Sequence, residues 1–232
     1  DTVILRHKTH ATAALAASDA FGSEVDLECG SGLQALKTAV DSGYIPESKI
    51  DEHLRRVLSL RMELTESNPD FNYLPQITPH DAAIETFVLL KNDGILPIDG
   101  KRIFLVGPNA SDTLMPLGNY NGTPLHTSTI EEGLNQCFAI AETVTDADMI
   151  VYAGGLNPQL EGEELPIDIP GFHKGDRTRI ELPENQVEEI RQLKKLGKPL
   201  VLLLCTGSAI ALENIIDETN AIMVCWYAGE DM

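Results

Sequence analysis

The sequence has few basic residues, and this excludes two classes of partner. Its 232 residues include 17 Lys and Arg against 36 Asp and Glu, which gives a formal net charge of −19. Nucleic acids and anionic membranes are bound through clustered Lys and Arg. We therefore expect no nucleic-acid partner and no membrane partner, whereas a neutral substrate such as a sugar would be indifferent to this charge.

Long apolar runs and paired cysteines are also missing. No apolar run is long enough to span a bilayer, and the first ten residues lack the apolar core of a signal peptide. The four cysteines, Cys29, Cys137, Cys205 and Cys225, form no C-x-x-C pair and have no histidine at metal-ligand spacing. We expect no metal site. Cys205 and Cys225 lie in apolar runs, which predicts buried thiols rather than disulfides.

The beginning of the chain is predicted to be mostly helical. Leu33, Leu36 and Val40 share one helical face, and a second helix is expected to begin near Pro46. The segment EVDLECG, residues 24–30, is predicted to be a strand that ends in a turn. Residues 65–80 contain three prolines and no periodicity, which predicts a linker between a domain at 1–64 and a domain at 81–232.

The second domain shows the pattern of an α/β fold. Helices are expected at about 81–90, 130–137 and 184–197, and strands at 102–107, from 149, at 198–205 and at 221–227. The apolar runs do not alternate with polar residues and are separated by helices, which indicates a mostly parallel sheet covered on both faces.

A long loop at 154–183 separates two of these strands and carries Glu161, Glu163 and Glu164. A solvated acidic loop is one interpretation. The other is a catalytic acid, because glycoside hydrolysis needs one carboxylic acid and a second carboxylate. Further along the loop, Asp176 and Arg177 could form a structural ion pair or orient a sugar hydroxyl. The spacing alone does not decide either question.

A tight turn after the strand at 102–107 is the other place where an α/β site could form. Its sequence, VGPNAS, lacks both the G-K-[ST] ending and the G-x-G-x-x-G spacing of nucleotide-binding loops. We expect no nucleotide and no other cofactor. His7 and His10 lie three residues apart without an evident third ligand, which favours a surface helix start over a metal site.

Several stretches, taken in order, resemble family 3 glycoside hydrolases, the β-glucosidase and β-xylosidase family. They are DLECG, LQALKTAVDSGYIPESKIDEHLRRVLSLR, VLLKNDGILPI, IFLVGPNA, GNYNGTP, LEGEE, PGFHKGDRTRIELP and CWYAGE. GNYNGTP and the loop between LEGEE and GDR look most like the β-xylosidase branch. The resemblance implies the end of a (β/α)8 barrel domain followed by most of an α/β sandwich domain, so that the chain is incomplete at both ends.

The resemblance also implies an activity and an acid. The activity would be that of a retaining exo-β-glycosidase that removes terminal β-linked xylose or glucose from oligosaccharides during polysaccharide degradation. The acid/base glutamate matches a position in LEGEE. Glu161 is favoured because Gly162 follows it, Glu163 is the runner-up and Glu164 the third candidate. Asp176 and Arg177 are weak candidates for substrate binding.

The nucleophile is not assigned in this chain. The family carries it in an S-D motif; Asp1 has no residue before it, and Asp19 falls in an Ala-rich helical segment. We therefore expect the chain alone to be inactive and to pack on the missing part of the barrel. The family implies a periplasmic or secreted enzyme. One departure concerns Glu24, which stands where the family usually has glycine.

The alternative is a non-enzymatic α/β domain that binds a small ligand or has a regulatory role. It would use the loops at the strand ends, around Asn109, Asn119 and Gly155.

Overall fold

A computed structural model of the chain describes residues 7–28, 30–66, 77–119, 121–161 and 166–231. The chain divides into two compact units, Asp1–Pro75 and Gln76–Met232. The prediction of a 1–64 domain, a 65–80 linker and an 81–232 domain stays a prediction.

The first unit is helical in its described part. Its main elements are α2 (Ala13–Gly22), η1 (Gly32–Ala35), α3 (Leu36–Asp41) and α4 (Glu47–Glu66). Thr12 caps α2 by accepting a hydrogen bond from the backbone N–H of Leu15. Buried side chains of the two shorter helices meet in a small core, which contains Ala14, Phe21, Ala39 and Ile45.

The strand predicted at 24–30 is wrong over residues 24–28. Residues 24–28 have no strand geometry, and Cys29 lies outside the described residues. A strand needs a hydrogen-bonding neighbour, and the described part of this unit contains no strand. The predicted helix start at His7–His10 is also absent, and His10 instead contacts Asp19 at 3.0 Å.

Ion pairs hold the EVD segment on α4 instead. The guanidinium of Arg56 donates to both carboxylate oxygens of Asp26, at 2.7 and 2.8 Å. These hydrogen bonds lower the pKa of Asp26 below its ordinary value. Glu24 has φ of +63°, in the left-handed region that glycine adopts most easily.

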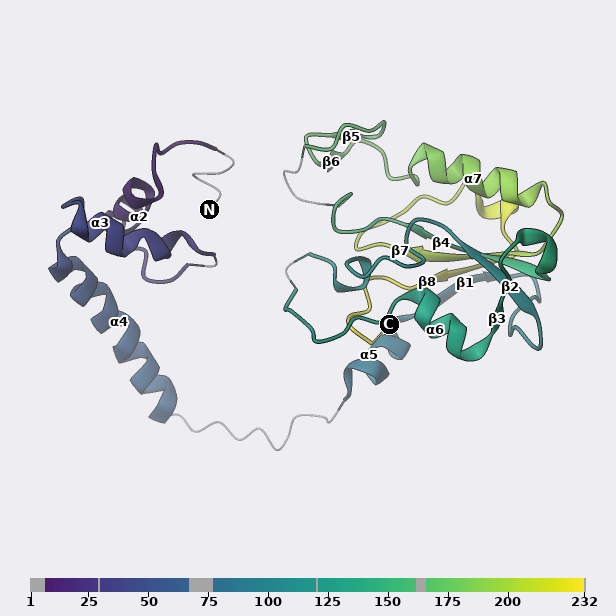
Figure 1. Ribbon diagram of the computed structural model, residues 1–232, viewed down its shortest axis with the longest axis horizontal. Coiled ribbons are helices and arrows are strands. Elements are labelled where there is room, and N and C mark those ends of the chain that lie inside the picture. Colours follow the sequence, from purple (N-terminus) through teal and green to yellow (C-terminus); the bar gives the residue numbers. More distant parts are fainter. Residues whose placement is uncertain (1–6, 29, 67–76, 120, 162–165, 232) are drawn as a thin grey trace. The chain divides into compact units, whose positions relative to one another are not determined.

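A six-stranded sheet forms the centre of the second unit (Figure 1). Its order is β1-β8-β7-β4-β2-β3, and every pair is parallel except β1 with β8. The α/β prediction with a mostly parallel sheet is therefore confirmed. The strands are β1 (Val88–Asn92), β2 (Arg102–Val106), β3 (Ala139–Ile140), β4 (Met149–Gly155), β7 (Leu200–Cys205) and β8 (Ala221–Val224).

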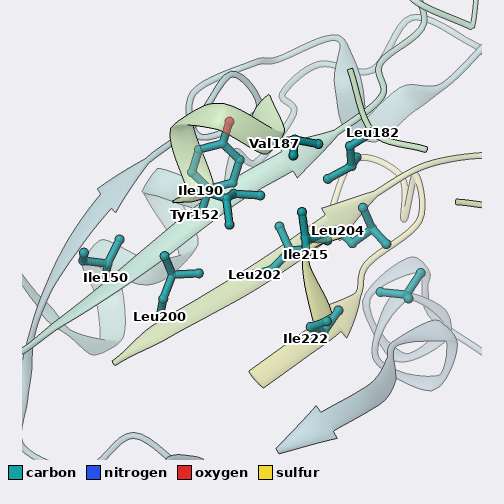
Figure 2. Close-up of a cluster of buried hydrophobic side chains, with 11 residues drawn as sticks. Ile150, Tyr152, Leu182, Val187, Ile190, Leu200, Leu202, Leu204, Ile215 and Ile222 are labelled. Atoms are coloured by element: carbon teal, nitrogen blue, oxygen red, sulfur yellow. The ribbon is translucent and has the colours of Figure 1, made fainter. Parts of the chain in front are cut away.

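Helices cover both faces of this sheet, as the continuous apolar runs predicted. Even-numbered side chains of β4, β7 and β8 pack with α7 (Glu184–Lys194), whose Val187 and Ile190 complete the cluster (Figure 2). Odd-numbered side chains of the same strands face the opposite way, where Ile130 and Leu134 of α6 (Ile130–Cys137) are packed. Figure 1 shows α7 and α6 on opposite faces of the sheet.

The helix predicted at 81–90 is wrong in its second half. Helix α5 covers Pro79–Thr86, and Val88–Asn92 is the antiparallel edge strand β1. Val88–Leu90 carry large aliphatic side chains that suit either structure, and pairing with β8 decides between them.

The long loop contains a small hairpin that we did not predict. Strands β5 (Phe172–His173) and β6 (Asp176–Arg177) pair antiparallel within it.

No described helix is both long and apolar enough to cross a bilayer.

The thiols test the packing of the sheet. Cys205 and Cys225 are buried free thiols, as predicted, and Cys137 is exposed. A hydrogen bond with Cys225 and burial raise the pKa of the Cys205 thiol well above its ordinary value.

Because the thiolate is the reactive form, alkylation of the native chain should modify Cys137 and leave Cys205 and Cys225 intact until urea unfolds it. Peptide mass mapping measures this, and Cys205 reacting as fast as Cys137 in the folded chain would contradict the described packing.

Candidate active site

Three loops leave the same edge of the sheet. Strands β4, β7 and β8 are neighbours and run parallel, so their carboxyl ends lie together. The loops after them begin at Leu156, Thr206 and Cys225. In open α/β sheets this edge is where ligands bind.

Two buried amide side chains fix the start of the long loop. Gln186 pairs with the backbone of Gly155 in both directions, accepting from its N–H and donating to its carbonyl, each at 2.8 Å. Asn109 donates to the carbonyl of Leu156 at 3.0 Å. Gln186 and Asn109 are 2 % and 1 % exposed, so both hydrogen-bonding partners are shielded from water. The loop therefore leaves the sheet from a rigid base.

A turn then delivers Glu161. The carbonyl of Asn157 accepts from the N–H of Leu160 at 3.0 Å and of Glu161 at 2.9 Å. The side-chain amide of Asn157 donates to Asp112 at 3.1 Å, which ties the turn to the segment after β2. The position of Glu161 is thus set by backbone and side-chain contacts over the four residues before it.

The Glu161 carboxylate reaches the other two loops. Its Oε1 accepts from the Ser208 hydroxyl at 2.5 Å. Its Oε2 accepts from the Tyr227 hydroxyl at 2.8 Å and from the Gly207 N–H at 3.2 Å. These three donors come from the loops after β7 and β8, so Glu161 joins all three strand-end loops.

Arg177 supports this cluster from the hairpin. Its Nη1 donates to the Ser208 hydroxyl at 2.9 Å and to the Ala209 carbonyl at 3.1 Å. Its Nη2 donates to the Glu181 carbonyl at 3.4 Å. Burial lowers the pKa of Arg177 and the nearby negative charge of Glu161 opposes this shift. The guanidinium remains a donor in either case.

Tyr227 is held by shape as well as by its hydroxyl. A Cβ on Gly207 would lie 3.0 Å from its ring, and a Cβ on Gly118 would lie 3.1 Å from it. Burial and the hydrogen bond to Glu161 raise the pKa of the Tyr227 phenol well above its ordinary value. The preceding Trp226 has φ of +55° and donates to the carbonyl of Thr86 at 3.0 Å. The left-handed backbone of Trp226 is a strained conformation at the turn after β8. At this turn the Trp226 side chain bonds Thr86 and the Tyr227 side chain bonds Glu161.

The structure brings some of the candidate residues together and leaves others apart. Glu161 and Arg177 share the cluster through Ser208, whereas Asp176 is exposed on β6. Glu163 and Glu164 lie outside the described residues. Asn109 bonds the carbonyl of Leu156 at the start of the long loop, and Gly155 is bonded there by Gln186. Asn119 is exposed.

Sequence reasoning missed Gly207, Ser208 and Tyr227. The signals for them are the place of Gly207 and Ser208 shortly after the predicted strand at 198–205, and the place of Tyr227 at the end of the predicted strand at 221–227 and within CWYAGE. These residues meet Glu161 because β4, β7 and β8 are neighbours in the sheet, although they are far apart in the sequence. The cluster offers a positioned carboxyl with hydroxyl and amide donors, which suits proton transfer.

A family model describes most of the second unit. Residues 87–232, more than half of the chain, match the glycosyl hydrolase family 3 C-terminal domain.

Curated relatives are similar over almost the whole chain. A probable exo-1,4-beta-xylosidase of Aspergillus terreus is 30% identical over 264 aligned residues, which cover 97% of this chain and 32% of the relative. A xylan 1,4-beta-xylosidase of Xylanibacter ruminicola is 46% identical over 82 residues, 35% of this chain and 10% of the relative.

Solved structures agree with this likeness. A GH3 exo-beta-xylosidase in complex with a xylobiose aziridine activity-based probe has a TM-score of 0.61 at 26% identity, over 98% of this chain and 33% of that one. A beta-glucosidase from Listeria innocua in complex with glucose has a TM-score of 0.60 at 25% identity, over 99% and 35%. The chain spans about a third of the length of the curated relatives that it matches over most of its own length.

Proposed function

Because the chain belongs to glycosyl hydrolase family 3, we propose that it supplies the acid/base side of a retaining exo-β-glycosidase. We call the whole enzyme, in which this chain is joined to the parts that its relatives carry in addition, the full-length enzyme. Its substrates are oligosaccharides with terminal β-linked xylose or glucose. The xylose preference rests on GNYNGTP and the long loop, and on xylosidases among the similar proteins.

One observation carries the proposal. Glu161 is a half-buried carboxylate on a loop with a rigid base, at the sheet edge where the loops after β4, β7 and β8 meet. A solvated acidic loop would not require two buried amides to fix its base or three donors to orient one of its glutamates.

Glu161 has two roles in this proposal. In the first step its proton passes to the glycosidic oxygen as the bond to the anomeric carbon breaks, while a carboxylate nucleophile attacks that carbon. In the second step Glu161 takes a proton from water, and the water oxygen displaces the nucleophile from the sugar. The nucleophile belongs to a part of the full-length enzyme outside this chain, and retaining enzymes hold the two carboxyl groups about 5–5.5 Å apart.

In the full-length enzyme, residues 1–64 form the end of the barrel domain and pack on the rest of that barrel, and residues 81–232 form the sandwich domain. This enzyme works in the periplasm or outside the cell.

Arg177 acts on the cluster through Ser208. Its hydrogen bonds support this role better than a direct role in sugar binding.

The test compares the full-length enzyme with this chain alone. The full-length enzyme should hydrolyse aryl β-xylosides or β-glucosides, and proton NMR of the first product should show the β-anomer, because two displacements retain the configuration. The chain alone should show no hydrolysis because it lacks an assigned nucleophile. Inactivity of the full-length enzyme on both substrates, with tight binding of a small ligand, would favour a non-enzymatic binding domain instead.

A further inference from the structure

We propose that Tyr227 is a positioning residue that sets the protonation equilibrium of Glu161 by donating its phenolic proton to that carboxylate. The proposal rests on the proposed acid/base role of Glu161. It adds a residue from the loop after β8, outside the loop that carries the acid.

The Tyr227 hydroxyl has little freedom to choose another acceptor. It lies 2.8 Å from Oε2 of Glu161. Its ring lies against Gly207 and Gly118, close enough that a Cβ at either position would come within 3.0 or 3.1 Å of ring atoms. A Cβ on Gly207 would also lie 2.8 Å from Oε2 of Glu161, so an added side chain at either position would crowd the Tyr227–Glu161 pair. The glycines therefore make room for the ring, and the ring aims the hydroxyl.

The other contacts of the carboxylate act in the same direction. Ser208 could in principle donate or accept, but Arg177 can only donate. Because Arg177 donates to the Ser208 oxygen at 2.9 Å, the Ser208 proton is left for Oε1 of Glu161 at 2.5 Å. The Gly207 N–H is also a donor only. All the contacts given for this carboxylate are thus donors, and donors stabilise the ionised form relative to the protonated form.

The surrounding ionisable groups leave Glu161 as the group that such a change would affect. Arg177 faces it from β6 and Tyr227 from the loop after β8. The Cys205 thiol of β7 belongs to the same apolar cluster as Tyr227. It shares a hydrogen bond with Cys225 and interacts electrostatically with Asp112. The phenol and the Cys205 thiol both have raised pKa values and remain neutral through the acidic range.

A proton donor must be protonated to work, so the alkaline limb of the pH profile of kcat/KM reports the loss of that proton. Tyr227→Phe removes one donor to the ionised carboxylate and keeps the ring. In the full-length enzyme the alkaline limb should therefore move to higher pH, by about one pH unit. Ser208→Ala removes the donor to the other oxygen and should move the limb the same way. It tests the shared premise, that loss of a donor to this carboxylate moves the limb, even if Tyr227→Phe does not fold: an unmoved limb in Ser208→Ala overturns that premise and the proposal with it.

Tyr152→Phe is the matched control. Tyr152 is also a tyrosine that donates to a glutamate, Glu189 at 2.6 Å, but it belongs to the core cluster beneath α7. Its removal should leave the limb in place. A structural role for Tyr227 would lower kcat/KM at every pH without moving the limb.

The outcomes separate this proposal from the proposed function. If Glu161→Gln shows the leaving-group dependence of a lost proton donor, while either Tyr227→Phe or Ser208→Ala leaves the limb unchanged or Tyr152→Phe moves it as far, the positioning role is overturned and the acid/base role stands. If Glu161→Gln shows no such dependence, the role of Glu161 itself fails, and the positioning role fails with it. A shift in both variants but not in Tyr152→Phe supports the proposal.

Discussion

Replacing Glu161 by glutamine in the full-length enzyme is expected to slow the hydrolysis of xylobiose or cellobiose by about 100- to 10,000-fold, the usual contribution of general acid catalysis. Glutamine keeps the shape of the side chain but cannot donate a carboxylic proton. Cleavage of a substrate with an alkoxide leaving group depends on that proton. A dinitrophenyl glycoside has a leaving group that departs without it, so its first step should be affected much less. Steady-state and burst kinetics on the two substrate types measure this difference.

Glu163→Gln provides the comparison for this prediction. It lies in the same LEGEE stretch and carries the same change of charge. We expect it to affect both substrate types alike and weakly. If the dependence on the leaving group appears in Glu163→Gln and is absent in Glu161→Gln, the acid is two residues further along, and Glu161 is an anchor for the loop.

Replacing Gly155 by alanine is expected to destabilise the second unit by about 3 kcal/mol or more. Gly155 has φ of +113°, and a Cβ there would lie 1.9 Å from the carbonyl oxygen of Cys205. That oxygen belongs to the backbone of a central strand and cannot move aside like a flexible side chain. The added methyl group would therefore separate β4 from β7 or break the pairing of Gly155 with Gln186. Urea unfolding of the chain, followed by fluorescence of Trp226, its single tryptophan, measures the loss.

Gly197→Ala is the matched control for this effect. Gly197 also has positive φ, +72°, but nothing lies within 4 Å of the position that a Cβ would occupy. Its replacement should cost only the backbone strain, about 1 kcal/mol. Equal losses at Gly197 and Gly155 would show that the close approach to Cys205 is unimportant.

Local patterns were sufficient to predict several elements. The helix predicted at 130–137 is α6, and the structure adds a capping box between Thr129 and Glu132 at its start. The apolar runs from 149 and at 198–205 became β4 and β7, because a strand buried on both faces needs no alternation. The helix predicted at 81–90 is wrong for Val88–Leu90, because these side chains suit helix and strand alike and the partner strand β8 lies more than a hundred residues away in the sequence.

The sequence by itself determined the family, the α/β class and three candidate glutamates for the catalytic acid, because motifs and periodicity depend on residues that are close together in the sequence. Only the tertiary structure decided which groups surround Glu161. Ser208 and Tyr227 are 47 and 66 residues away from it. They meet it because the sheet places β4, β7 and β8 side by side and in parallel, and so brings together the loops that follow them.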